Sequence, residues 1–265
     1  MALAVITGAA SGIGAGLARE AARRGMRVVL ADRDAEALAV VAAEIGDAAQ
    51  AVPTDVTDPA ALERLAEAAF ALGPVSLLFN NAGVLSTGRC WEIEPAIWQR
   101  DLAVNVGGVV NGLAAFVPRL IGQNLPARIV NTASVGGFLP SPLMAPYSAS
   151  KFAVVALTEC LAGELAMLGA PVAVSLLAPG PVKSAIFREP PPPAADGFHA
   201  MLTGMLEEHG LTPDEFAPLV FAAIDRGDYW IIPQPEALEP GFSQRNAAIV
   251  ARQAPAFFQV DETRP

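Results

Sequence analysis

Short apolar runs alternate with longer helix-like segments along most of the chain. The runs are rich in Val, Ile and Leu and apolar on both faces; they lie at 3–6, 27–31, 49–52, 75–79, 128–131 and 172–177, with a seventh at 229–232. Strands of a parallel sheet have this composition when helices cover both faces of the sheet. The helix-like segments lie at 12–24, 34–45, 58–72, 95–123 and 148–168. The alternation predicts an α/β fold, a doubly wound, mostly parallel sheet of about seven strands with helices on both faces, Rossmann-like in arrangement.

A single domain is expected over residues 1–265, because no Ser/Gly linker and no internal repeat divides the sequence. The segment 189–196, EPPPPAAD, contains four consecutive prolines, which cannot lie in a helix or a central strand. With its flanks it forms an insertion at about 184–210 that is longer than ordinary connections. We expect this insertion to be a lid over a substrate site; the alternative is a surface excursion without a role.

Net charge and hydropathy limit the classes of partner. The net charge of −10 argues against nucleic-acid binding through a basic surface, and acidic membrane surfaces should repel the chain. The apolar stretch 102–117 is shorter than the ~20 residues of a membrane span and contains Asn105 and Asn111, so a buried helix is expected. The first residues, MALAVITG, lack the basic region of a signal peptide. We therefore expect a cytoplasmic protein that binds neither nucleic acid nor membrane.

The two cysteines, Cys90 and Cys160, lie in neither a CxxC nor a zinc-type spacing. Only His199 and His209 could join them as His/Cys ligands. Two free thiols and no metal site are therefore expected.

The first apolar run leads into TGAASGIG at 7–14, and a helix-like segment follows. Glycines allow the backbone to turn tightly and to approach a pyrophosphate closely, while the helix N-terminus presents free N–H groups to the phosphates. The strand before and the helix after the turn are the context that a dinucleotide-binding turn requires.

The second apolar run ends at Asp32. A carboxylate at this place accepts hydrogen bonds from the ribose hydroxyls and repels a 2′-phosphate, which favours NAD over NADP. Arg33 follows directly and could pair with a 2′-phosphate, so NADP stays possible. Asp32 could instead be a helix N-cap, but Asp34 can fill that role.

In YSASK at 147–151, Tyr147 and Lys151 are one helical turn apart. A tyrosine with its ordinary pKa of about 10 is a poor base at neutral pH. A nearby positive charge favours the phenolate and lowers the pKa. The spacing is therefore either a packing accident or a tuned acid, in which Tyr147 would transfer a proton as general acid or base and Lys151 would lower its pKa.

Three motifs in this order, TGxxxGIG at 7–14, NNAG at 80–83 and YxxxK at 147–151, resemble those of the short-chain dehydrogenase/reductase family, in its compact single-domain form. The resemblance covers about residues 1–232. It implies an oxidoreductase that transfers a hydride between a nicotinamide cofactor and an alcohol or ketone. Family members commonly form dimers or tetramers through the helices at 102–120 and 148–168.

The resemblance also implies a role for individual residues. Ser134 would hold the substrate oxygen beside Tyr147, Asn105 would hold a water that links Lys151 to solvent, and Lys151 would bond the nicotinamide ribose. The catalytic set is thus Asn105, Ser134, Tyr147 and Lys151. The cofactor-binding set is Gly8, Ser11, Gly12, Ile13, Gly14, Asp32, Arg33, Asp55, Val56, Asn81, Ala82, Gly83, Tyr147, Lys151, Pro179, Gly180, Val182 and Ser184. Val56 would pack on the adenine ring, and Ser184 replaces the family's usual threonine while keeping a hydroxyl.

Apolar residues dominate the three segments expected to line the substrate pocket, 84–88, 135–145 and 185–206. A hydrophobic secondary alcohol or its ketone is therefore the expected small-molecule substrate. One alternative is an NADPH-dependent 3-oxoacyl-carrier-protein reductase, which only Arg33 supports. Another is a catalytically silent NAD(P)-sensing binding protein, which should have lost one of the four catalytic residues; none is missing.

The two long apolar helices predict a homodimer or homotetramer, because each is expected to keep apolar surface after covering the sheet. The residues expected on that surface include Val154, Val155, Leu157 and Leu161. The tail at 242–258 reads as a short amphipathic helix with an aromatic end. Its aromatic residues, together with Trp230, are expected to pack at a subunit edge or on the lid; these are Phe242, Phe257 and Phe258.

Overall fold

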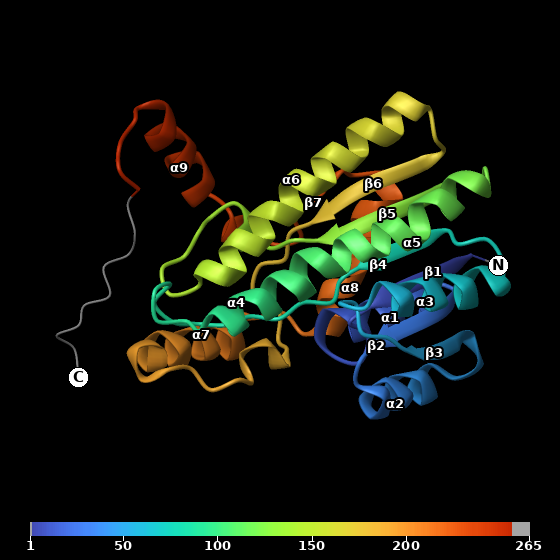
Figure 1. Ribbon diagram of the computed structural model, residues 1–265, viewed down its shortest axis with the longest axis horizontal. Helices are drawn as coiled ribbons and strands as arrows, with labels where there is room; N and C mark the ends of the chain where they lie inside the picture. The colour runs from blue at the N-terminus through green and yellow to red at the C-terminus, as the bar shows by residue number, and fades with distance from the viewer. Residues whose placement is uncertain (1, 256–265) are drawn as a thin grey trace.

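A seven-stranded sheet forms the centre of the computed structural model, which describes residues 2–255 (Figure 1). The strands are β1 (Leu3–Thr7), β2 (Arg27–Asp32), β3 (Ala49–Pro53), β4 (Leu77–Asn80), β5 (Ala127–Thr132), β6 (Val172–Leu177) and β7 (Trp230–Ile231). Their order is β3-β2-β1-β4-β5-β6-β7, and every neighbouring pair is parallel. The predicted doubly wound fold is confirmed, with the strand order changing direction between β1 and β4.

Nine helices accompany the sheet within the described part of the chain. They are α1 (Gly12–Arg23), α2 (Ala35–Ile45), α3 (Pro59–Ala71), α4 (Pro95–Leu102), α5 (Gly108–Gly122), α6 (Ala145–Leu168), α7 (Asp196–His209), α8 (Pro213–Arg226) and α9 (Gly241–Val250). Residues of one strand point to opposite faces in turn. Ala4 and Ile6 therefore pack with α1, α2 and α8, whereas Leu3 and Val5 pack with α3, α5 and α6.

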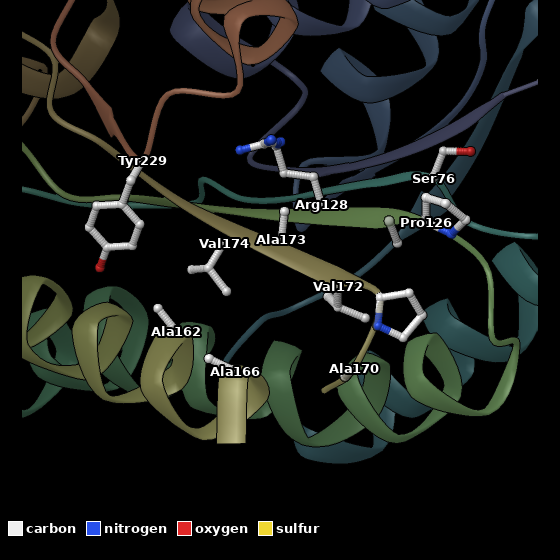
Figure 2. Close-up of a pocket in the computed structure, with 12 residues that line it drawn as sticks. Ser76, Pro126, Arg128, Ala162, Ala166, Ala170, Val172, Ala173, Val174 and Tyr229 are labelled. Atoms are coloured by element: carbon white, nitrogen blue, oxygen red, sulfur yellow. The ribbon is translucent and has the colours of Figure 1, made fainter. Parts of the chain in front are cut away.

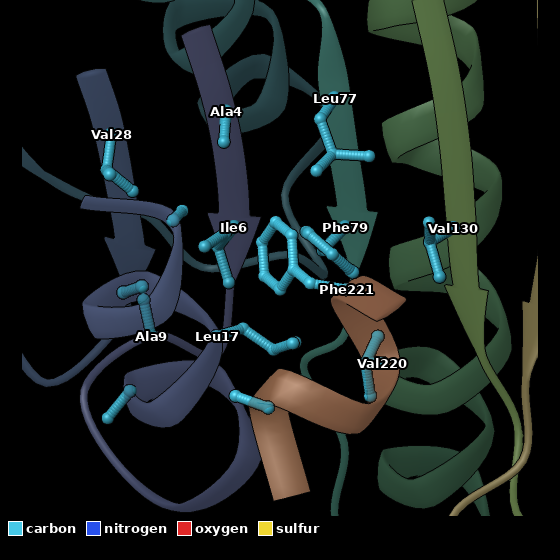
Figure 3. Packing of buried hydrophobic residues seen from close by; sticks show 14 of the residues in the cluster. Ala4, Ile6, Ala9, Leu17, Val28, Leu77, Phe79, Val130, Val220 and Phe221 are labelled. Carbon is cyan, nitrogen blue, oxygen red and sulfur yellow. The ribbon is translucent and has the colours of Figure 1, made fainter. Parts of the chain in front are cut away.

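Figure 3 shows the first of these two cores, where α8 closes over the centre of the sheet. The rings of Phe79 and Phe221 meet there at 5.9 Å between centroids. The sequence analysis did not find α8. Its signal is a capping box, in which Thr212 and Glu215 bond each other's backbone N–H groups at the start of the helix.

The predicted single helix at 95–123 is instead three segments. A π-helical turn, Ala103–Gly107, separates α4 from α5 and contains Asn105. The whole stretch Pro95–Gly122 is long and apolar enough to cross a membrane by length and composition. The buried side chains of Phe116 and Leu120 pack in the core with α3, and a core helix of a soluble protein passes the same test.

The residues predicted to form an exposed apolar surface on α6 are wrong. Val154 and Val155 are buried, and so is Leu161, because they lie on the helix face that covers the sheet. The large apolar side chains that are exposed on these helices include Val110 of α5 and Met167 of α6.

The tail helix α9 lies after β7, and the part of the tail that contains Phe257 and Phe258 falls outside the described residues. Phe242 and Trp230 both contact Phe138 edge-on, at 5.7 Å and 5.9 Å between ring centroids. These two aromatic residues thus pack within the chain on the segment between Ser134 and Tyr147.

A buried polar chain crosses from the sheet to α6. Asn80 Nδ2 donates to Oδ1 of Asn131 (2.9 Å), and Asn131 Nδ2 donates to Oγ1 of Thr158 (3.1 Å). Gly112 of α5 lies against this chain, since a Cβ atom there would be 2.2 Å from Oδ1 of Asn80. A side chain at Gly112 has no space unless the polar chain moves.

Gly112→Ala should therefore lower the free energy of unfolding by about 1–3 kcal/mol, the usual range for overpacking a core. Urea denaturation followed by circular dichroism measures this loss. Gly204→Ala is the matched control, because a Cβ atom at Gly204 in α7 meets nothing within 4 Å and should stabilise its helix by up to ~1 kcal/mol. An equal effect of the two substitutions would contradict the packing argument.

Candidate active site

The glycine-rich turn between β1 and α1 packs against the NNAG loop that follows β4. A Cβ atom at Gly8 would lie 2.8 Å from Cα of Ala82, and one at Gly14 would lie 2.0 Å from the Gly8 carbonyl oxygen. Gly8 and Gly12 also have φ angles of +68° and +53°, which favour glycine. The turn therefore has no space for side chains at its centre.

The N-terminus of α1 is free to receive an anion. Its N-cap residue, Ser11, makes no capping hydrogen bond with its side chain, and the first turn contains no acidic residue. Free N–H groups and the positive end of the helix dipole favour phosphate at such a place. This geometry fits the pyrophosphate of a dinucleotide.

Thr7 and Asn81 fix the NNAG loop beside the turn. The hydroxyl of Thr7 accepts hydrogen bonds from the N–H groups of Asn81 (2.9 Å) and Ala82 (3.1 Å), and Asn81 Nδ2 donates to the Thr7 carbonyl (2.9 Å). The sequence analysis gave Thr7 no role, although its hydroxyl makes this connection.

Asp32 lies at the end of β2, where the predicted ribose contact requires it. Its carboxylate accepts hydrogen bonds from the backbone N–H groups of Ala10 (3.1 Å) and Asp34 (3.1 Å), so it is tied to the glycine turn. Asp34 caps α2 by accepting from the N–H of Ala37 (3.0 Å), and Asp32 is therefore not needed as the cap. The neighbouring Arg33 is exposed.

The other two residues predicted to contact the adenosine, Asp55 and Val56, differ in their exposure. Asp55 is exposed and accepts hydrogen bonds from the backbone and the hydroxyl of Thr57. Val56 is buried, and its side chain packs against Gly108 of α5, where a Cβ atom would come within 2.8 Å of it. Val56 thus contributes mainly to the core.

The segment after β6 returns to the glycine turn. The Pro179 carbonyl accepts from the N–H of Val135 (3.0 Å), next to Ser134. Further along, Ser184 lies so close that a Cβ atom at Gly12 would come within 2.9 Å of its Cβ. Gly180 fits against Ala237, since a side chain would come within 2.9 Å of that residue. The PGPVKS segment thus connects the catalytic and phosphate-binding regions.

Ser134, Tyr147 and Lys151 come together at the carboxyl end of β5 and the start of α6. All three are buried, and the Ser134 side chain lies close enough to Tyr147 to affect the pKa of its hydroxyl. Lys151 Nζ donates to the carbonyl of Thr132 (2.9 Å) and lies 5.6 Å from the centre of the Tyr147 ring.

The expected lowering of the Tyr147 pKa is wrong for the protein alone. Burial raises the pKa of Tyr147, and the nearby Ser134 side chain only partly opposes this. Burial also lowers the pKa of Lys151 to about 8. The reason lies in the geometry: the helical spacing places the ammonium group over the ring face, so it is not paired with the hydroxyl.

Asn105, in the π-helical turn, connects three parts of the site. Its Oδ1 accepts from the N–H of Val84 (2.8 Å), and its Nδ2 donates to the Val84 carbonyl (2.9 Å) and to Oγ of Ser150 (2.9 Å). Ser150 in turn donates to the Tyr147 carbonyl (2.7 Å). Sequence reasoning treated Ser150 only as a small residue; its burial in the middle of YSASK is the feature that identifies it.

A small space separates Asn105 from Lys151. A Cβ atom at Gly83 would lie 3.3 Å from Oδ1 of Asn105 and 3.5 Å from Nζ of Lys151. Both groups can hydrogen-bond a water, and the absence of a side chain at Gly83 leaves room between them.

The three segments expected to line the pocket also meet. The N–H of Gly88 donates to the Leu143 carbonyl (2.9 Å), and Gly88 forms a bridge with Met144, one turn before Tyr147. A Cβ atom at Gly88 would be 3.2 Å from Pro192 of the insertion. Figure 1 shows α7 and the start of α6 at the same end of the sheet.

A separate open groove of about 790 Å³ contains none of these residues. It lies between β6 and the second half of α6 and is lined mainly by small apolar side chains (Figure 2). The ring of Tyr229 points toward α6 in this view, whereas Arg128 points away from that helix. Arg128 donates to Oγ of Ser175 (2.6 Å). We give the groove no catalytic role, because the buried Ser–Tyr–Lys cluster lies elsewhere.

In residues 2–255, no group of three or more His, Cys, Asp or Glu side chains could hold a metal ion. Cys90 and Cys160 are both free and exposed.

Ligands of open α/β sheets bind beyond the carboxyl ends of the strands, where the strand order changes direction. Here that place holds the glycine turn after β1 and the NNAG loop after β4, and the Ser–Tyr–Lys cluster lies beside them at the end of β5. The fold and the site together define a dinucleotide-dependent oxidoreductase.

The chain belongs to the short-chain dehydrogenase/reductase family, whose model, described as short chain dehydrogenase, matches residues 2–193. A C alpha-dehydrogenase from Sphingobium sp. is 34% identical over 96% of this chain and 87% of its own. A 1-deoxy-11-beta-hydroxypentalenate dehydrogenase from Streptomyces exfoliatus is 37% identical over 88% of this chain and 83% of its own.

A crystal structure of a family member from Burkholderia phymatum in complex with NAD superposes with a TM-score of 0.93. It is 38% identical, and the alignment covers 97% of each chain. Binding of a nicotinamide cofactor follows from the family and from the fit of the glycine turn.

The buried Lys151 predicts a pH dependence of stability. A pKa that falls from 10.5 in the unfolded chain to about 8 in the folded protein corresponds to about 3 kcal/mol. Between these values the unfolded chain binds more protons, so the free energy of unfolding should rise as the pH increases from about 8 to about 10.5. Below about pH 8 the ammonium is charged in both states, and the full cost of burying it remains.

Lys151→Met should remove this rise and increase the stability of the cofactor-free protein at pH 7. Urea denaturation of the wild type and the variant between pH 7 and 10.5 measures the difference. Parallel curves for the two proteins would contradict a lowered lysine pKa.

Proposed function

We propose that the protein is an NAD-dependent alcohol dehydrogenase or ketone reductase that acts on hydrophobic secondary alcohols and their ketones. The observation that carries the proposal is the buried cluster of Ser134, Tyr147 and Lys151 next to a glycine turn without space for side chains. A relative named for a hydroxypentalenate fits an alcohol substrate.

The residues present fit a nicotinamide dinucleotide. The N-terminus of α1 would hold the pyrophosphate, Asp32 the adenosine ribose and Lys151 the nicotinamide ribose. When bound, the nicotinamide gives or takes the hydride. Asp32 favours NAD because its carboxylate would repel a 2′-phosphate.

Side chains of this protein would transfer the proton. Tyr147 would pass a proton between its phenolic oxygen and the substrate oxygen, which Ser134 would hold by a hydrogen bond. Lys151, whose ammonium lies 5.6 Å from the centre of the Tyr147 ring, would act on the phenolate only together with the charge of the bound cofactor. A water between Asn105 and Lys151 would connect the site to solvent and return the proton. With an oxidised nicotinamide bound beside it, Tyr147 would give up its proton more easily, because the added positive charge would favour the phenolate.

The insertion at 184–210 would be a lid that excludes water from the hydride transfer. Its apolar side chains, with those of 84–88 and 135–145, favour a hydrophobic substrate. Phe187 contacts His199 edge-on at 5.5 Å between ring centroids, so the first part of the insertion packs against α7.

A cytoplasmic homo-oligomer is the proposed form of the enzyme. The support for this proposal is that α5 and α6 carry exposed apolar side chains, among them Val110 and Met167. Size-exclusion chromatography with light scattering should give a dimer or tetramer; a single species of 27 kDa would contradict this.

The function is tested by oxidation of NADH and NADPH against a panel of ketones. The panel includes aliphatic and aryl ketones and a 3-oxoacyl thioester. Faster turnover of an apolar ketone with NADH is expected. Preference for the thioester with NADPH would instead support a 3-oxoacyl reductase, and cofactor binding without any turnover would support a sensing protein.

Tyr147→Phe should reduce turnover by at least about 100-fold, in line with the loss of a general acid or base, and should leave cofactor binding intact. Tyr229→Phe is the matched control, because the buried Tyr229 hydroxyl has no hydrogen-bond partner among residues 2–255 and its removal should cost neither activity nor stability. Steady-state kinetics and NADH fluorescence titration measure both. Full turnover in the Tyr147 variant would exclude the mechanism.

A further inference from the structure

The guanidinium group of Arg100, near the end of α4, donates hydrogen bonds to three residues of the chain. Nε and Nη2 both donate to Oδ1 of Asp101 (3.1 and 2.9 Å), and Nη2 also donates to Oγ of Ser86 (2.7 Å). Nη1 donates to both carboxylate oxygens of Glu189 (2.9 and 2.8 Å). A guanidinium has its N–H donors in a fixed fork, so these bonds fix Ser86, Asp101 and Glu189 around one rigid group.

The partners of Arg100 come from parts of the chain that the site needs in fixed positions. Ser86 lies in the loop 84–88 on the proposed substrate wall, and Glu189 begins the proline run of the insertion. Pro192 in that run lies against Gly88 of the same loop. Arg100 thus joins α4, the substrate wall and the start of the proposed lid.

The two carboxylates bound by Arg100 differ in exposure. The side chain of Asp101 is 0% exposed, whereas that of Glu189 is 46% exposed. Asp101 is therefore a permanent counter-ion that keeps the fork oriented. The pair with Glu189 meets solvent, and ion pairs of that kind are weak and are screened by salt.

Glu189 directly precedes four prolines, which limit how freely the backbone of the insertion can turn. Pro192 is extended, with φ −66° and ψ 153°, and the short helical turn Pro193–Ala195 that follows leads directly into α7. Because each proline fixes its own φ, holding Glu189 also restrains the direction of the chain toward α7. A weak, reversible contact at this place suits a segment that must open for each substrate.

We propose that Arg100 is a positioning residue and that its two-bond pair with Glu189 is the latch that holds the insertion closed over the substrate wall. Asp101 keeps Arg100 in place when the latch opens. Arg100 does not touch the reacting atoms; it acts through Ser86 and Glu189. This inference rests on the proposed function in that it takes the insertion to be a lid over the substrate site.

The test compares the wild type with Glu189→Gln, and Glu63→Gln is the matched control. Glu63 pairs with Arg119 at a similar exposure, 48%, but on the far helices α3 and α5. Hydrogen exchange of the amides of α7 reports lid opening without any substrate. Ketone KM and kcat report its effect on binding and on chemistry.

Glu189→Gln should speed exchange in α7 and raise the ketone KM, each by about 2- to 5-fold, the range expected for one exposed ion pair. The kcat should change by less than about 2-fold, because the chemical groups stay in place. The same rise in KM should follow from 0.5 M NaCl in the wild type and be absent in the variant. Glu63→Gln should alter none of these values.

Arg100→Lys should not rescue the latch, since one ammonium cannot serve three partners in the geometry of the fork. Unchanged α7 exchange in Glu189→Gln, equal changes in Glu63→Gln, or wild-type behaviour of Arg100→Lys would each overturn the proposal. The exchange experiment needs no turnover, so failure of the latch is distinguishable from failure of the proposed function.

Discussion

The contact between Gly8 and Gly14 is the constraint on which the cofactor side of the molecule depends. Because neither residue carries a side chain, the turn can close on itself and against the loop after β4. The Thr7 hydroxyl then reaches the N–H groups of that loop, and the first turn of α1 keeps its own N–H groups free. A single methyl group at either glycine would separate the two loops. The glycine turn is therefore a packing requirement of the fold as much as a binding site.

The catalytic side is organised around a buried cation. Lys151 is fully surrounded by protein and bonds one backbone carbonyl, that of Thr132. Without a ligand, burial thus disfavours the charged form of both side chains, the ammonium of Lys151 and the phenolate of Tyr147. In the proposed function both conditions would be relieved by the cofactor, with ribose hydroxyls beside the ammonium and a positive ring beside the phenol. The resting site is prepared for a ligand and is not at its own electrostatic optimum.

Much of the fold was predictable from sequence because buried parallel strands leave an apolar pattern that little else imitates. The proposed catalytic set comes from spacing and family resemblance, and the structure brings three of its members, Ser134, Tyr147 and Lys151, together. Contacts between distant segments were not predictable. The predicted shift of the Tyr147 pKa had the wrong direction. Burial raises this pKa, and the spacing on a helix does not show that the lysine lies over the ring face. The π-helical turn reads as ordinary helix, since its apolar residues have the same pattern in both. The five bonds of Arg100 join residues up to 89 positions apart, and no local pattern records them.

The π-helical turn at Ala103–Gly107 has a consequence for how this helix tolerates change. It holds one residue more than an α-helical turn would. The wide turn takes up this extra residue, so the faces of α4 and α5 stay nearly in phase. Loss of one residue within it would restore a regular α-helix without moving Arg100 to another face, but Asn105 lies in the turn itself and would leave Val84 and Ser150. A one-residue gap that is harmless in a surface loop would here disconnect Asn105 from the loop after β4.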